Sequence, residues 1–419
     1  MTKLSRYITP EDIVLSLTNT PQITFEVTDL CNLNCSYCCY GDLYNDRDPR
    51  VKKKMSCNNA LNLLIYLDSL WSSEYNCSQN KNVYISFYGG EPLLNMKLIQ
   101  SVVDFIEALH CKTRTFTFTM TTNALFLDKH IDYLVLHNFK LLISLDGDEE
   151  NTAYRIDKKN RPAFRNIIKN VELCRKKYPE YFDKHVNFNA VLHNKNTVKS
   201  IYHFFHEHYN KIPRIGQLNN VGVRPNKESE FWNMYRNATE NLFQSENYSE
   251  IESALFMSAS TYNSAGTYLM QYSDFVYKDY NELLYGKRMP ENSYPTGTCI
   301  PFSRKIFVTV NGKILPCERI GHQFSLGNIS DKGVDIDFQK IADKYNLYYA
   351  KINGQCKSCY NRRACIQCMF NLPNIDGAVV NCHGYMNKTN FKRYENNQLS
   401  FFSRNPEAYS RIMNEVIFQ

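Results

Sequence analysis

The sequence predicts an α/β fold in which six parallel strands alternate with helices, followed by a smaller cysteine-rich domain that contains a β-hairpin. Between residues 20 and 225, apolar or β-branched runs alternate with amphipathic helical patterns, which is typical of βαβ units. From Cys299 onward, closely spaced cysteines and turn residues replace this alternation. The two patterns together predict a barrel-like first half and a loop-rich domain that is not built from βαβ units.

Six expected strands and five expected helices make up the first half. The strands are Ile23–Thr28, Val83–Tyr88, Thr115–Thr121, Leu141–Leu145, Val186–Leu192 and Asn219–Val223. The helices are Ala60–Leu70, Leu98–Leu109, Ile131–Leu136, Phe164–Tyr178 and Val198–His208. The strands carry Thr and Asn among their apolar residues, which favours a partial TIM-like (β/α)6 barrel with a partly polar, ligand-accessible interior. An open doubly wound sheet is the alternative.

The remaining elements follow from local signals. Residues 226–298 are rich in Asn, Ser, Tyr and Glu, with helical patterns at Phe231–Phe243 and Ile251–Met257. Ile306–Val310 and Lys313–Leu315 flank Asn311-Gly312, the favoured pair for a two-residue type I′ hairpin turn. We therefore expect five segments. They are an N-terminal extension (1–20), the barrel (21–225), a helical bridge (226–298), a cysteine-rich domain (299–385) and a helical tail (386–419).

Composition narrows the class of protein. The chain has 419 residues and a net charge of +7, with no basic tract dense enough to predict nucleic-acid binding. No segment resembles a signal peptide or a membrane span, so we expect a cytoplasmic protein without a membrane partner. In that reducing compartment, clustered cysteines indicate metal rather than disulfides. Ten of the fifteen cysteines fall into two clusters. The other five are expected to be buried small hydrophobes: Cys39, Cys57, Cys77, Cys111 and Cys174.

The first cluster follows the first strand directly. Cys31, Cys35 and Cys38 lie on a loop at the carboxyl end of that strand, where ligand sites gather in parallel α/β folds. Three thiolates can bind three irons of a 4Fe–4S cluster, which normally takes four cysteines, so one iron is left open. The alternatives are buried thiols or a zinc site, but zinc prefers four ligands in paired knuckles.

This loop resembles a known motif. Cys31, Cys35 and Cys38, with the aromatic Tyr37 before the last cysteine, are similar to the cluster motif of the radical S-adenosylmethionine (SAM) superfamily. The resemblance covers about residues 20 to 225 and makes the three cysteines the catalytic cluster ligands. It implies that SAM chelates the open iron through its amino and carboxylate groups. Reduction of the cluster then cleaves SAM to methionine and a 5′-deoxyadenosyl radical, which abstracts a hydrogen atom.

Residues at later strand ends match cofactor-binding positions of the same family. Gly89-Gly90-Glu91 resembles the motif that holds the SAM amino group, although such a turn can be purely structural. The resemblance implies that Arg155 pairs with the SAM carboxylate, unless it is a solvated surface arginine, and that Leu192 touches the adenine. The full set implied by the resemblance is Tyr37, Gly89, Gly90, Glu91, Thr121, Asn123, Ser144, Asp146, Arg155 and Leu192.

The second cysteine cluster resembles the SPASM extension of many radical SAM enzymes, which binds two auxiliary 4Fe–4S clusters. By that resemblance, Cys299, Cys317 and Cys368 hold one cluster, and Cys356, Cys359, Cys365 and Cys382 hold the other. Two departures stand out. Two residues separate Cys365 from Cys368 instead of the usual three, and Lys305 stands where some relatives have an extra cysteine. Either a non-cysteine residue closes the first auxiliary site or that site is open. A zinc ribbon is the alternative, but seven cysteines do not divide into complete four-cysteine zinc sites.

The resemblance implies a maturase of ribosomally synthesised peptides (RiPPs) with three 4Fe–4S clusters, including the SAM-binding one. Its partners would be a precursor peptide or protein and a reductant such as flavodoxin or ferredoxin. A thioether or carbon–carbon cross-link is the expected product. One alternative is anaerobic sulfatase maturation, which makes formylglycine and needs a carboxylate base that spacing alone does not identify. Another is a binding or electron-transfer protein that has lost turnover. About twenty residues precede the first strand, so we expect residues 226–298 or another protein to recognise a leader peptide.

Overall fold

The chain folds into two compact units. The computed structural model describes residues 7–77, 81–109, 113–274, 276–277, 280–285 and 294–417. One unit, here called the sheet unit, combines Glu11–Tyr248 with Ile300–Phe338. The other, here called the helical unit, combines Met1–Pro10, Ser249–Cys299 and Gln339–Gln419.

The sheet unit is built on ten strands in the order β10-β9-β8-β7-β1-β2-β3-β4-β5-β6. The strands are β1 Gln22–Thr28, β2 Lys81–Gly89, β3 Arg114–Thr122, β4 Lys140–Ser144, β5 Val186–Leu192, β6 Arg214–Gln217, β7 Ile306–Val308, β8 Lys313–Leu315, β9 Gly327–Ser330 and β10 Gly333–Asp335. Strands β1 to β6 are parallel throughout. Strand β7 pairs parallel with β1, and β7 to β10 are antiparallel.

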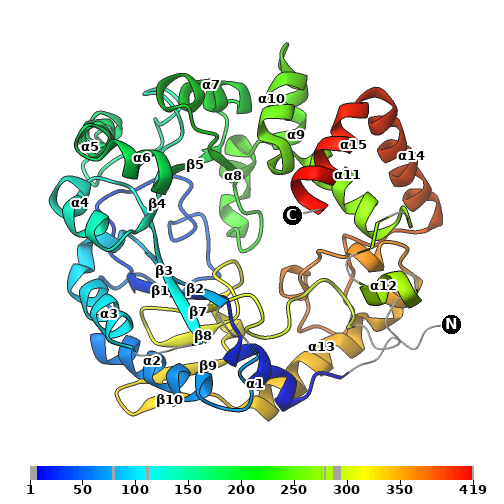
Figure 1. Cartoon of the computed structure of the whole chain (residues 1–419), viewed down its shortest axis with the longest axis horizontal. Helices are drawn as coiled ribbons and strands as arrows, with labels where there is room; N and C mark the ends of the chain where they lie inside the picture. Colours follow the sequence, from blue (N-terminus) through cyan, green and yellow to red (C-terminus); the bar gives the residue numbers. More distant parts are fainter. Residues whose placement is uncertain are drawn as a thin grey trace. The chain divides into compact units, whose positions relative to one another are not determined.

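Helices connect the parallel strands. They are α2 Cys57–Trp71, α3 Met96–Ala108, α4 Leu127–Leu136, α5 Phe164–Lys177, α6 Pro179–His185 and α7 Val198–Tyr209, while α1 Pro10–Thr18 precedes β1. Helices α2 to α5 follow one another around the outside of the strands (Figure 1). Because β1 to β6 are adjacent in chain order, every right-handed crossover brings its helix to the same face. A doubly wound sheet would instead reverse its strand order. The predicted partial (β/α)6 fold is confirmed.

The two faces of the parallel strands differ in chemistry because side chains alternate along a strand. On the face toward the helices, Phe25 stacks with Phe87 at 6.4 Å between ring centroids, and Phe87 with Phe139 at 5.8 Å. On the opposite face, the Ser86 and Thr119 hydroxyls are hydrogen-bonded at 2.6 Å. The interior is therefore partly polar, as the Thr-containing strands predicted.

One predicted strand and one predicted helix of the sheet unit differ from the structure. The sixth strand is Arg214–Gln217, and the segment predicted in its place, Asn219–Val223, contributes only an isolated bridge from Val223 to Tyr44. The helix predicted over 231–243 is broken into α8 Glu228–Met234 and α9 Ala238–Phe243. The break occurs at Asn237, whose side chain accepts from the first backbone N–H groups of α9 and so starts a new helix.

The hairpin is present, but its turn is not type I′. Strands β7 and β8 pair through Phe307 and Leu315. Gly312 N donates to the Thr309 carbonyl at 2.9 Å, so Val310 and Asn311 are the central turn residues. Only Gly312 has positive φ (+86°), whereas type I′ requires positive φ at both central positions. This geometry is a type I turn followed by a glycine bulge.

The compact units divide the chain differently from the expected segments. Residues 300–338 join the sheet unit because β7 pairs with β1, with Ile306 opposite Ile23. The expected cysteine-rich domain is thereby split between the two units.

The helical unit is formed mainly by helices. They are α10 Tyr248–Leu255, α11 Ser260–Gln271, α12 Tyr280–Tyr285, α13 Phe338–Ser358, α14 Lys388–Arg404 and α15 Pro406–Ile412. Tyr345 is fully buried on α13, and Phe370 packs edge-on against it at 5.4 Å between ring centroids. Across the described ranges of the chain, none of the helices combines the length and apolar character that a membrane span needs.

Burial of a carboxyl group in the polar interior leads to a prediction on stability. Glu26 on β1 is buried and accepts from Val310 N at 2.8 Å, and burial raises its pKa to about 7. Because the folded pKa exceeds the ordinary value of 4.5, the stability associated with the protonated form is lost as pH rises from about 4.5 through 7. We expect Glu26→Gln to raise the melting temperature by a few degrees at pH 8 and by less at pH 6, measured by calorimetry.

Glu74→Gln is the matched control, because Glu74 is exposed after α2 and its replacement leaves the melting temperature within error at both pH values. An equal effect of the two substitutions at pH 8 would show that burial of Glu26 has no energetic consequence.

Candidate active site

The predicted cluster ligands lie on one loop between β1 and α2. Cys31, Cys35 and Cys38 follow β1, and Cys38 N donates to the Cys35 carbonyl at 3.1 Å in a tight turn. The loop is docked to the chain after β4, because Asn34 N donates to the Ile156 carbonyl at 2.7 Å. The three thiols therefore lie at the carboxyl end of the parallel strands.

The three thiols interact electrostatically and differ in acidity. Burial raises the pKa of Cys31 to about 11 and that of Cys35 to about 12. A hydrogen bond from Cys39 and then the positive charge of Arg50 lower the pKa of Cys38 to about 6. The Arg50 Nη2 atom lies 3.5 Å from Cys38 Sγ. Metal binds the thiolate and favours the deprotonated form at all three, so the loop fits a three-thiolate cluster site.

The five scattered cysteines do not share one environment. Cys174 is buried in α5, as expected, while Cys39 and Cys57 are half-buried. Cys77 is exposed, so the expectation of a buried side chain is wrong there, because the residue lies in the surface loop after α2. Cys111 lies outside the described residues.

The Gly-Gly-Glu segment presses the end of β2 against the cluster loop. Gly90 N donates to the Thr28 carbonyl and Glu91 N to the Leu30 carbonyl, both at 2.8 Å. A Cβ atom on Gly90 would overlap the Leu30 carbonyl oxygen, and Gly89 adopts a φ of +127°. Both positions require glycine because of this close backbone approach, so the segment does more than reverse the chain.

The Glu91 carboxylate joins β2 to β3. It is fully buried and accepts from Thr122 Oγ1 at 2.7 Å, from Asn123 N at 2.8 Å and from Leu93 N at 3.1 Å. Burial raises its pKa to about 7, although these hydrogen bonds oppose the rise. The carboxylate is thus engaged by the protein framework, and it orients the strand end that carries Asn123.

The other expected cofactor contacts fall on both faces of the strands. Thr121 and Ser144 lie on the polar inner face of β3 and β4, and both are half-buried. Asn123 Nδ2 donates to Asn32 Oδ1 in the cluster loop at 2.7 Å. Leu192, by contrast, is fully buried on the helix-facing side of β5. The inner face therefore presents Thr121 and Ser144, but not Leu192.

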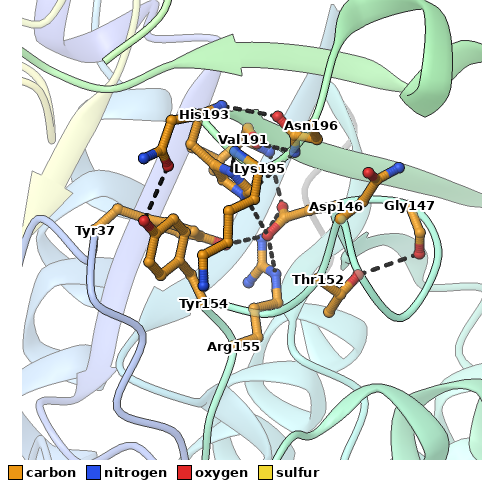
Figure 2. A network of polar contacts seen from close by, with 12 residues as sticks. Tyr37, Asp146, Gly147, Thr152, Tyr154, Arg155, Val191, His193, Lys195 and Asn196 are labelled. Carbon is orange, nitrogen blue, oxygen red and sulfur yellow. Dashed lines mark hydrogen bonds and ion pairs between the residues drawn. The ribbon is translucent and has the colours of Figure 1, made fainter. Parts of the chain in front are cut away.

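Arg155 and Asp146 form a buried ion pair (Figure 2). Arg155 Nη2 lies 2.8 Å from Asp146 Oδ1, and Nε lies 3.0 Å from Oδ2. Burial alone would raise the pKa of Asp146, but the charge of Arg155 and hydrogen bonds to the carboxylate outweigh burial and lower it. Arg155 is therefore not the solvated surface arginine that the sequence left open.

Four expected auxiliary-cluster cysteines surround one pocket in the helical unit. The pocket is lined by Cys356, Cys359, Cys365 and Cys382, together with Tyr294, Gln355 and Arg362. Gln355, on α13, accepts from Cys382 N at 3.0 Å through Oε1 and donates to the Val380 carbonyl through Nε2. This clamp holds the segment with Cys382 against the helix with Cys356. Four thiols around one pocket fit the donor set of a 4Fe–4S cluster.

The other three auxiliary cysteines are divided between the units. Cys299 and Cys368 belong to the helical unit, where the two thiols interact electrostatically. Cys317 belongs to the sheet unit. In that unit, Lys305 Nζ lies 3.0 Å from Glu318 Oε2.

Some supporting residues were not expected from the sequence. Thr122 rather than its neighbour Thr121 contacts Glu91. Gln355 directly precedes Cys356, so its position next to an expected cluster ligand could have marked it as a supporting residue. Arg50 carries no such signal, because it is twelve residues from Cys38 in an irregular segment.

Sequence comparison links this site to known enzymes. Residues 25–207 match the radical SAM superfamily. The radical SAM cyclopropyl synthase TigE of Paramaledivibacter caminithermalis is 27% identical over 177 residues, which are 41% of this chain and 35% of that protein. A cysteine-type anaerobic sulfatase-maturating enzyme of Clostridium novyi is 28% identical over 181 residues, 42% of this chain and 45% of that protein. The chain therefore matches less than half the length of these curated relatives.

A solved structure is similar over nearly the whole chain. Native anSMEcpe with bound AdoMet, which is SAM, and the Kp18Cys peptide superposes with a TM-score of 0.58 and 16% identity. The similarity covers 94% of this chain and 99% of that one, and at this identity it concerns the fold. With three cysteines on the loop after β1, the Gly-Gly-Glu segment docked against them and the sequence match over the parallel strands, residues 25–207 form a radical SAM domain.

Proposed function

We propose that this chain is a radical SAM peptide maturase that forms a thioether or carbon–carbon cross-link in a ribosomally synthesised peptide. The observation that carries the proposal is the pair of thiol sites: three cysteines at the strand ends and four around one pocket of the helical unit. When bound, a reduced 4Fe–4S cluster and SAM supply a 5′-deoxyadenosyl radical that removes a hydrogen atom from the substrate.

The chain's own residues would hold and shield these groups. Cys31, Cys35 and Cys38 would bind the first cluster, with Arg50 placing positive charge beside Cys38. The backbone of the Gly-Gly-Glu segment, Thr121, Asn123 and Ser144 would surround SAM. Burial of the strand ends excludes water, which protects a reactive radical from side reactions.

The auxiliary cysteines support oxidative chemistry on a sulfur-containing peptide. Cross-linking leaves an electron that an auxiliary cluster can accept. Cys356, Cys359, Cys365 and Cys382 would hold a closed cluster, whereas Cys299, Cys317 and Cys368 would hold one with an iron that no cysteine closes. An open iron can bind a substrate thiolate, because iron accepts soft sulfur ligands. A reductant such as flavodoxin or ferredoxin would supply electrons to the first cluster.

Anaerobic sulfatase maturation is the second candidate. It is favoured by the similarity to the Clostridium novyi enzyme named for that activity. It differs in its product, because formylglycine carries an aldehyde, whereas a cross-link removes two hydrogen atoms and forms no aldehyde.

The proposed reaction can be tested with precursor peptides that are encoded by genes next to the gene for this chain. We expect the reconstituted protein, incubated anaerobically with SAM, a reductant and a cysteine-bearing precursor peptide, to produce a peptide that has lost two hydrogen atoms, measured by mass spectrometry. An aldehyde that reacts with a hydrazine probe would instead support formylglycine formation. No change in any peptide or sulfatase substrate, despite SAM cleavage, would contradict both.

Cluster-dependent SAM cleavage gives a prediction that is independent of the substrate. We expect reduced, reconstituted protein to release 5′-deoxyadenosine, measured by liquid chromatography, and Cys35→Ala to abolish the release because one iron loses its thiolate. Cys77→Ala is the control, since Cys77 is exposed. Parent-level release by Cys35→Ala would overturn the assignment of this loop.

The second thiol site predicts the iron content. Three four-iron clusters give about twelve irons per chain. Gln355→Leu removes the clamp on Cys382, and we expect about eight irons, measured by inductively coupled plasma mass spectrometry on anaerobically purified protein. Gln339→Leu, an exposed change on the same helix, should retain about twelve. Full iron in Gln355→Leu would show that the clamp does not support a cluster, and zinc in place of the iron would remove the auxiliary clusters.

A further inference from the structure

Asp146 is a fully buried carboxylate with donors on both oxygens (Figure 2). Oδ1 accepts from Arg155 Nη2 and from Val191 N, each at 2.8 Å. Oδ2 accepts from Arg155 Nε at 3.0 Å and from the Tyr37 hydroxyl. A carboxylate offers about four acceptor positions. These four donors fill them, and His193 Nε2 also lies 3.8 Å from Oδ2, so Asp146 has no acceptor position left for a cofactor.

Tyr37 is enclosed by the same group of residues. It lies between Cys35 and Cys38 in the cluster loop, and its side chain is buried. Its hydroxyl donates to Asp146. Its ring lies 5.5 Å from the Arg155 guanidinium and stacks with His193 at 5.6 Å between centroids. Both the polar and the aromatic parts of Tyr37 are therefore engaged by the protein.

The donors to Asp146 come from three separate parts of the sheet unit. Tyr37 belongs to the cluster loop, Arg155 follows β4, and Val191 lies at the end of β5. A backbone hydrogen bond also holds this loop to the segment after β4, because Ser36 N donates to the Tyr154 carbonyl at 3.3 Å. One carboxylate thus ties the loop that bears the cysteines to the arginine expected to bind SAM.

The geometry points to Asp146 and Tyr37 as positioning residues that hold the cysteine loop and Arg155 in one arrangement, and that act on SAM through these groups without touching it. This inference rests on the proposed function and departs from the family resemblance, which makes both residues cofactor contacts. Arg155 stays available for the SAM carboxylate, since among the described residues no acceptor is bonded to its Nη1 atom. A guanidinium with two nitrogens fixed presents the third in a defined direction.

Tyr37→Phe separates the two roles. If Tyr37 contacts SAM through its ring, phenylalanine preserves that contact and affinity is unchanged. If the hydroxyl holds the loop to Asp146, its loss raises the dissociation constant of SAM. We expect a rise of about tenfold or more, the range for a hydrogen bond to a charged acceptor, with the iron content unchanged. The measurement is anaerobic equilibrium dialysis with labelled SAM, with iron counted in the same samples.

Tyr181→Phe is the matched control. Tyr181 and Tyr37 are each 8% exposed, and the Tyr181 hydroxyl donates to the Phe139 carbonyl at 2.6 Å in the same unit. Its loss removes a buried hydrogen bond outside the Asp146 network, so SAM affinity should stay within about twofold of the parent. Parent-like affinity in Tyr37→Phe, or an equal loss in Tyr181→Phe, overturns the inference.

A double-mutant cycle tests whether Tyr37 acts through Asp146. Asp146→Asn alone should weaken SAM binding, and adding Tyr37→Phe should weaken it no further, because both changes break the same link. Additive losses would mean that Tyr37 acts independently and would overturn the inference. If Asp146→Asn does not fold, Tyr37→Phe decides alone. Failure of the parent to bind iron or SAM would instead refute the proposed function, so the two failures are distinguishable.

Discussion

Two buried carboxylates hold the strand ends together around the cysteine loop. Glu91 accepts donors from β3 and from the turn after β2, and Asp146 accepts donors from the cluster loop and from β5. A buried carboxylate is costly unless its acceptor positions are filled. Each therefore forces the separate segments that donate to it into one arrangement. Asp146 holds the cysteine loop directly through Tyr37, whereas Glu91 holds the strand ends beside that loop.

The sequence predicted the core of the sheet because its signals are local. In β5, Val186–Leu192, apolar and polar residues alternate over 186–190, and the structure gives the predicted bounds without change. The sixth strand was misplaced because Arg214–Gln217 offers only Ile215 as an apolar residue. Its pairing with β5 is a tertiary effect that overrides local propensity. The type I′ turn predicted at Asn311-Gly312 is wrong for a different reason: the register of β7 against β8 decides which residues are central in the turn.

The site was predictable only where the motif is contiguous. Cys31, Cys35 and Cys38 lie within eight residues, and the structure keeps them on one loop. The contacts that support them cross long stretches of sequence. The Tyr37–Asp146 bond spans 109 residues and the Glu91–Thr122 bond spans 31. Spacing cannot reveal such pairs, because the strand register that brings them together is set by the whole sheet. A resemblance can nominate Asp146, but it does not distinguish a ligand contact from a group already satisfied by the protein.

The ion pair between Lys305 and Glu318 bears on both candidate reactions. A protonated lysine has three donors and no lone pair, so an ammonium group held 3.0 Å from a carboxylate is not an iron ligand. Lys305 therefore does not supply the non-cysteine ligand that the sequence left open for the first auxiliary site. The same pair occupies Glu318, the carboxylate next to Cys317, and the charge of Lys305 helps to lower its pKa although burial opposes this. A weakly basic, engaged carboxylate is a poor candidate for the base that formylglycine formation requires. One ion pair therefore removes both Lys305 as an iron ligand and Glu318 as a catalytic base from consideration.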